Sequence, residues 1–146
     1  MMNRLSRVIV LVLVVFCGTF VGCSGSSKPE FTDVKGTVTY KGKKVTHGMV
    51  VFKAVDGDQR GVGPISSNGT FSLKSPVGPV VAAVVTRPAT NQDFNNPNRP
   101  AVKEVTLPPG VNLASLPPKR FESFNTSQLN FDINTENRQP INIALK

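Results

Sequence analysis

VKGTVTYKGK, the stretch from residue 34 to residue 43, is the most regular pattern in the chain. From Val34 to Tyr40, apolar or small residues alternate with polar ones, which is the period of a β-strand with one buried face. The KGK triplet that follows has the composition of a turn. The pattern therefore predicts a half-buried strand over residues 34–40 and a reversal of the chain at 41–43.

Other short strand patterns follow, separated by turn residues. Residues 45–55 have the apolar centre MVVF and lead into the polar tip DGD at 56–58. After a Gly/Pro-rich stretch, Asn68-Gly69 is the strongest hairpin pattern in the chain, and alternation resumes in FSLK. Two further segments alternate cleanly near the end, LNFDI at 129–133 and INIAL at 141–145.

VVAAVV at residues 80–85 is apolar without alternation. Its β-branched residues and the flanking Pro79 and Pro88 favour a central strand covered on both faces over a buried helix. With the other segments this makes six or seven strands and no convincing helix. We therefore expect an all-β fold, a single antiparallel β-sandwich.

Several of these segments match the pattern of one family. Residues 34–43 resemble the opening V-x-G-x-V-T-Y-x-G-K-P-V of transthyretin-like, carboxypeptidase-regulatory-like domains, and residues 47–52 match their next strand. SNGTFSL at 67–73 is similar to the D-x-D-G-x-F-x-L hairpin of these domains. Residues 116–121 and 126–129 resemble the I-P-x-K-Y…T-S-x-L segment of a bacterial lipoprotein branch.

The resemblance covers roughly residues 33–146. The chain departs from the family at Lys44, where Pro is usual, and at residues 80–84, where G-x-Y-x-V is typical. The resemblance implies a prealbumin-like sandwich of about seven strands. It implies little about function, because this fold carries many functions.

The first 23 residues have the organisation of a lipoprotein signal peptide. A basic head without acids precedes the apolar run at 8–16, and FVGC at 20–23 resembles the bacterial lipobox. We expect cleavage after residue 22, lipidation of Cys23 with palmitate or a similar chain, a flexible Gly/Ser-rich tether over 23–32, and the sandwich over 33–146. An uncleaved membrane anchor and an ordinary signal peptide are the alternatives.

Composition narrows the chemistry of the exported part. Both cysteines, Cys17 and Cys23, lie in the N-terminal region, so we expect no disulfide and no thiol chemistry in the domain. The net charge is +8, and it becomes +6 when Arg4 and Arg7 leave with the signal peptide. A domain with this charge could bind anionic lipid headgroups or an acidic polysaccharide. The alternative is that the charge only keeps the domain soluble. Nucleic acid is not expected as a partner.

The single histidine, His47, argues against an enzyme. One histidine cannot form a histidine metal cluster, and the Gly-x-Ser-x-Gly elbow is absent. Transthyretin-like hydroxyisourate hydrolases use several histidines and end in Tyr-Arg-Gly-Ser, whereas this chain ends in IALK. We therefore predict no catalytic residues, no metal and no cofactor, and expect His47 to be a surface turn residue. A hydrolase that depends on His47 is the least favoured alternative.

Three other features are weaker candidates for a function. Asp56 and Asp58 lack the further carboxylates that a calcium loop needs, so we expect a plain hairpin tip. Lys35 and Asn142 are nominal partners for an isopeptide crosslink, but their alternation places both on polar faces. Loops on a rigid sandwich often carry binding residues, so residues 88–100 and 117–127 are the candidate binding loops.

These observations lead to one functional expectation. We predict an exported lipoprotein, lipid-anchored to the cell membrane or outer membrane through Cys23, that displays a non-enzymatic β-sandwich as an interaction or structural module of the envelope. The alternative is a carbohydrate- or peptide-binding accessory module. An envelope protein or polysaccharide is the expected partner in either case.

Overall fold

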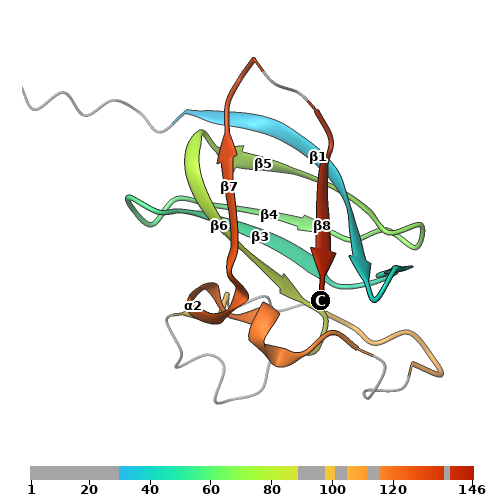
Figure 1. Ribbon diagram of the computed structural model, residues 1–146. Helices are drawn as coiled ribbons and strands as arrows, with labels where there is room; N and C mark the ends of the chain where they lie inside the picture. Colours follow the sequence, from blue (N-terminus) through green and yellow to red (C-terminus); the bar gives the residue numbers. More distant parts are fainter. Residues whose placement is uncertain (1–29, 89–97, 101–104, 112–115, 137–138) are drawn as a thin grey trace, which may run out of the picture.

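The computed structural model describes residues 30–88, 98–100, 105–111, 116–136 and 139–146. These residues form eight strands in two sheets, with two short helices between β6 and β7 (Figure 1). The elements are β1 Phe31–Tyr40, β2 Lys43–Lys44, β3 Met49–Ala54, β4 Arg60–Pro64, β5 Thr70–Pro76, β6 Gly78–Val85, η2 Lys119–Glu122, α2 Phe124–Ser127, β7 Leu129–Ile133 and β8 Ile141–Leu145. The predicted all-β sandwich of two sheets is confirmed at this level.

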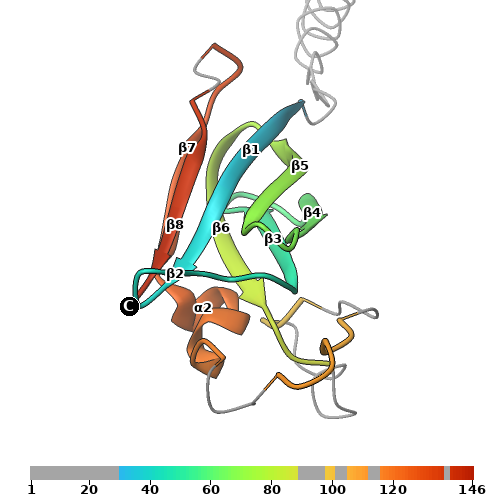
Figure 2. The ribbon, with the colours of Figure 1, turned by 90° about the vertical axis from the view of Figure 1, so that its right-hand side faces the viewer.

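One sheet has the order β2-β1-β5 with β8 paired to β1, and the other has the order β4-β3-β6-β7. In Figure 2, β7 and β8, the edge strands of the two sheets, lie on one side of the sandwich, and β4 and β5 lie on the opposite side. The predicted arrangement is wrong for one pair, because β8 runs parallel to β1, with Gly36 opposite Ile141 and Tyr40 opposite Leu145. Every other strand pair is antiparallel.

The core lies between the two sheets and is built on Phe52. Its ring is stacked on Phe131 at 5.7 Å between centroids and meets Phe71 edge-on at 6.1 Å. Phe71 comes from the other sheet, so its contact with Phe52 joins the two layers. The alternation predicted for β1 is confirmed, because Val34 and Val38 are buried and Lys35 is exposed. The last two strands, β7 and β8, occupy the predicted residues 129–133 and 141–145.

Strand β6 is covered on both faces, as its unbroken apolar run predicts. Val80, Ala82 and Val84 belong to the core between the sheets. Ala83 and Val85 face the other way, into a second apolar cluster that Val105 and Phe124 close from outside. The second cluster therefore explains why this strand does not alternate.

Strand β4 was not predicted, because its sequence, RGVGP, is rich in residues that usually break strands. Gly61 and Gly63 are the residues that let β4 approach β5 closely. A Cβ atom on Gly61 would lie 1.9 Å from the carbonyl oxygen of Lys74, and one on Gly63 would lie 2.4 Å from that of Ser72. Glycine here permits a close contact between backbones at the edge of the sandwich.

The predicted turns are confirmed. Lys41 and Gly42 both have positive φ, at 49° and 77°, as a two-residue hairpin of type I′ requires. At the tip before β5, the Asn68 side-chain oxygen accepts hydrogen bonds from the backbone amide and the hydroxyl of Thr70, at 3.1 and 2.7 Å. The DGD tip joins β3 to β4.

The region from 117 to 127 is not the loop that its sequence predicts. It forms η2 and α2, which lie below the sandwich in Figure 1, at the end where β6 finishes. Phe121 packs into the main core and Phe124 into the second cluster. Helices of four residues are too short to show a helical period, so packing of the two rings is what defines them.

Residues 1–29, and with them the predicted signal peptide and Cys23, lie outside the described residues. Strand β1 begins at Phe31, where Phe31 pairs with Pro76 and Thr32 with Ser75. The sheet thus starts two residues earlier than the predicted domain boundary. Among the described residues, no helix is long and apolar enough to cross a membrane.

Candidate functional site

The sandwich has two chemically different ends. We call the end where β1 begins the near end and the end where β1 finishes the far end; in Figure 1 the start of β1 and the C mark lie at opposite ends. The parallel partner β8 also finishes at the far end, because Leu145 is opposite Tyr40. Across the ten residues of β1, the two ends are separated by about 30 Å.

A groove of about 600 Å³ opens at the far end. Tyr40 and the residues of the β1–β2 turn form one wall, and the chain continues from there through Val45, Thr46 and His47 toward β3. The opposite wall comes from distant segments: Gly110 with Val111, and Leu116 with Pro117. The groove is thus assembled from parts of the chain that are more than 60 residues apart.

Three lysines of this groove have no ion pair with any residue that the structure describes. Lys41, Lys43 and Lys44 are exposed, and only Lys41 has a ring contact, with its Nζ 5.3 Å from the centroid of Tyr40. Two lysines elsewhere do have a carboxylate partner: Lys53 Nζ lies 3.6 Å from Asp58, and Lys74 Nζ lies 3.2 Å from Asp33. The groove therefore presents uncompensated positive charge.

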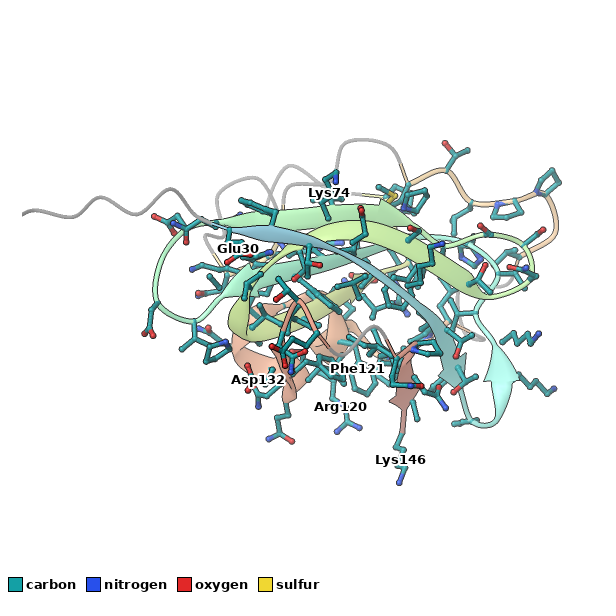
Figure 3. The ribbon with its side chains drawn as sticks, turned by 90° about the horizontal axis from the view of Figure 1, so that it is seen from above. Glu30, Lys74, Arg120, Phe121, Asp132 and Lys146 are labelled. Atoms are coloured by element: carbon teal, nitrogen blue, oxygen red, sulfur yellow. The ribbon has the colours of Figure 1, made fainter. Side chains whose placement is uncertain are left out.

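Among the described residues, the exposed acids lie at one end of the sandwich, whereas basic residues occur at both ends. The described exposed acids belong to the near end, as the strand register and the turns place them: Glu30, Asp33, Asp56, Asp58, Asp132 and Glu136. The far end has the three groove lysines together with Lys119, Arg120 and Lys146. Arg120 and Lys146 project outward from the molecule (Figure 3), and Arg120 donates a hydrogen bond to the Lys146 carbonyl. An anionic ligand would therefore be attracted to the far end.

His47 is a wall residue of the groove and is less exposed than predicted. Neither ring nitrogen is accessible or has a hydrogen-bond partner among the described residues. Burial lowers the pKa of His47 below its ordinary value of 6.5. The backbone of Thr86 opposes this shift in part, although no hydrogen bond of good geometry joins the two. The imidazole is therefore neutral, and no described acid or hydroxyl is placed to activate it.

This environment gives a pH-dependent stability. The unfolded chain binds a proton at His47 more readily than the folded chain, so the free energy of unfolding falls as the pH drops below about 6.5. His47→Gln cannot titrate and should lack this part of the decline. Urea unfolding of both proteins from about pH 7.5 to about pH 5 measures the difference. Parallel stability curves over this range would contradict the assignment.

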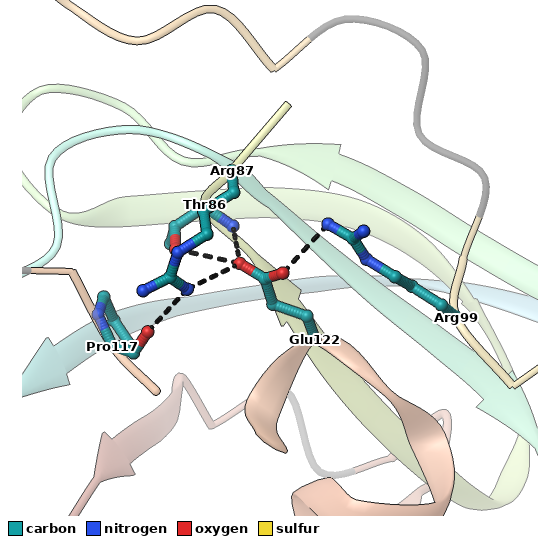
Figure 4. Close-up of polar contacts among 5 residues, drawn as sticks. All are labelled: Thr86, Arg87, Arg99, Pro117 and Glu122. Carbon is teal, nitrogen blue, oxygen red and sulfur yellow. Dashed lines mark hydrogen bonds and ion pairs between the residues drawn. The ribbon is translucent and has the colours of Figure 1, made fainter. Parts of the chain in front are cut away.

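A buried ion-pair cluster holds the far end together (Figure 4). Glu122 in η2 is only 2% exposed and lies between two arginines. Arg87 Nη1 donates to its Oε1 at 3.0 Å, and Arg99 Nη2 donates to its Oε2 at 2.9 Å. The backbone amide and hydroxyl of Thr86 contact the same Oε1 at 3.4 and 3.3 Å. One carboxylate thus connects three separate segments of the chain.

The same cluster positions the groove. Arg87 Nη1 also donates to the carbonyl oxygen of Pro117 at 2.7 Å, and Pro117 forms part of the groove wall. Sequence reasoning missed Arg87 and Glu122, because residues 35 positions apart on irregular segments leave no periodic pattern. Of the two candidate binding loops, 117–127 contributes Pro117 to the groove wall, and most of 88–100 lies outside the described residues.

The other sequence candidates are a metal site and the pair Lys35 and Asn142, which line one pocket on the neighbouring strands β1 and β8. In the part of the chain that the structure describes, no three His, Cys, Asp or Glu residues form a metal-binding group. Lys35 and Asn142 are both exposed, and the Asn142 side-chain oxygen accepts a hydrogen bond from the Thr37 hydroxyl at 3.3 Å. Comparisons with family models, with curated proteins and with solved structures gave no match.

Proposed function

We propose that this protein is an exported, lipid-anchored module that binds a ligand at its far end without catalysing a reaction. Cys23 would carry the lipid, and the residues up to Glu30 would form the tether. The observation that supports this best is the position of the groove. The tether would join the sandwich at the start of β1, and the groove opens at the opposite end.

This arrangement favours binding over a purely structural role. A tether joined at the near end leaves the far end directed away from the point of attachment. The far end carries the groove, unpaired lysines and irregular segments, which are the features of a binding surface on a rigid scaffold. The neutral, inaccessible nitrogens of His47 support a non-catalytic role for the groove.

We also propose that the domain is a prealbumin-like sandwich of the transthyretin-like family. Its family-like segments fall on structurally matching elements, since VKGTVTY lies in β1 and SNGTFSL forms the turn and start of β5. Seven strands remain when the two-residue β2 is set aside. These features support the resemblance.

Metabolic labelling with an alkyne analogue of palmitate tests the anchor. We expect the wild-type chain to be labelled in a bacterial host and to fractionate with membranes. Cys23→Ala should lose the label, because the thiol is the acceptor of the lipid. Cys17→Ala is the matched control, since it removes the only other cysteine and should keep the label. An unlabelled wild-type chain would overturn the proposed anchor.

A further inference from the structure

We propose that the far-end groove binds an acidic polysaccharide, a sugar polymer with a carboxylate or similar anionic group on repeated units. This inference rests on the proposed function, because it names the ligand of the same groove. It is carried by three observations: the groove itself, its unpaired lysines, and the absence of described exposed acids at that end.

The charge distribution selects an anionic ligand. Lys41, Lys43 and Lys44 line the groove within four residues of one another, and Lys119, Arg120 and Lys146 extend the basic surface beyond it. The only described acid at this end, Glu122, is buried between two arginines and is not available to neutralise the lysines. The acids at the near end are farther away than the Debye length of roughly 8 Å, so they offset the positive potential of the far end only a little.

The exposure of the lysines selects a polymer over a small anion. Each lysine lies in water, where a single ion pair contributes little to affinity. Several weak contacts made by one chain add through effective concentration, which a polymer with repeated charges provides. The lysine ammonium is a compact, mobile point charge and suits a flexible polymer better than one fixed anion.

The shape of the site favours a sugar chain over a membrane surface. The lysines lie along one wall of a groove that Tyr40 and Thr46 also line. A hydroxylated, ring-shaped ligand can enter such a groove and use both its polar and its apolar lining. A flat lipid surface would meet only the outer lysines.

Binding of fluorescein-labelled oligogalacturonate to the full chain, purified in a neutral detergent, tests the proposal by fluorescence anisotropy. We expect saturable binding that weakens with added salt, and no binding of labelled neutral dextran. Replacing Lys41, Lys43 and Lys44 together by Gln should weaken binding by about tenfold or more. The matched control replaces Lys35, Lys53 and Lys74 by Gln; it changes the net charge equally at other sites and should weaken binding by less than about threefold.

A second variant separates groove binding from diffuse attraction. Thr46 is exposed and lines the groove, so Thr46→Trp should fill the groove and reduce binding without changing the charge. Equal losses in the two lysine variants, or an unchanged affinity in Thr46→Trp, would overturn the groove as the site. Circular dichroism of each variant confirms that the β-sandwich is retained.

The membrane alternative is tested in the same assay. A small fraction of phosphatidylglycerol added to the micelles should leave oligogalacturonate binding largely intact, whereas complete displacement would assign the site to lipid headgroups and overturn the proposal. Loss of palmitate labelling with polysaccharide binding retained would defeat the proposed anchor alone. Labelling without any polysaccharide binding would defeat this inference alone.

Discussion

Replacing Glu122 with Ala is expected to lower the free energy of unfolding by about 3–5 kcal/mol, the cost of removing one partner from a buried ion pair. The loss is large because Arg87 and Arg99, with side chains 17% and 9% exposed, would face each other without the carboxylate between them. Small domains are stable by only about 5–15 kcal/mol, so the variant should be close to unfolding at ordinary temperature.

Chemical denaturation against a matched variant measures this effect. Glu136 is an exposed glutamate at the near end, so Glu136→Ala makes the same chemical change outside the cluster. It should alter stability by less than about 0.5 kcal/mol. Similar stabilities for the two variants would show that Glu122 does not hold the arginines in a low-dielectric environment.

Partial restoration gives a sharper test of the cluster. Glu122→Gln keeps the side-chain length and a hydrogen-bond acceptor but removes the charge. We expect a stability between those of wild type and Glu122→Ala, because the arginines regain an acceptor but not a counter-charge. Both variants should also loosen the groove wall at Pro117, because Arg87 donates a hydrogen bond to the Pro117 carbonyl oxygen.

Replacing Gly61 with Ala is expected to cost about 3 kcal/mol, at the upper end of the range for overpacking. The new methyl group would lie 1.9 Å from the backbone oxygen of Lys74 and 3.1 Å from a methyl carbon of Leu73. A backbone oxygen cannot rotate away as a side chain can, so β4 would have to move away from β5.

Val62→Ala is the control for this change, because Val62 lies on the same strand, points outward and is 48% exposed. Its loss should be less than about 1 kcal/mol. Thermal unfolding followed by circular dichroism compares the two variants. If Gly61→Ala were as stable as Val62→Ala, the close approach of β4 to β5 would not be a requirement of the fold.

Strands with local patterns were predictable from the sequence. The alternation over 34–40, 129–133 and 141–145 depends on residues two positions apart, so it can be recognised without knowing the fold. The same is true of the turn at Asn68-Gly69, where the two residues themselves favour the required backbone conformation. The buried run at 80–85 indicated a strand with two covered faces but not what covers the second face.

Elements that depend on distant contacts were not predictable in this way. Strand β4 exists because two glycines fit under the backbone of β5, and a local reading treats those glycines as strand breakers. Helix α2 is four residues long and is defined by where Phe124 packs. The parallel pairing of β8 with β1 depends on the path of the chain between sheets, which strand patterns do not contain.

The candidate site shows the same division. A positive net charge, a single histidine and three lysines at the turn of residues 41–44 can all be recognised in the amino-acid sequence. The fold was needed to show that these lysines share a groove with Gly110, Val111, Leu116 and Pro117, and that the described exposed acids lie at the opposite end. The reason is physical: composition and period are local properties, whereas the direction of each paired strand decides at which end its charged residues lie.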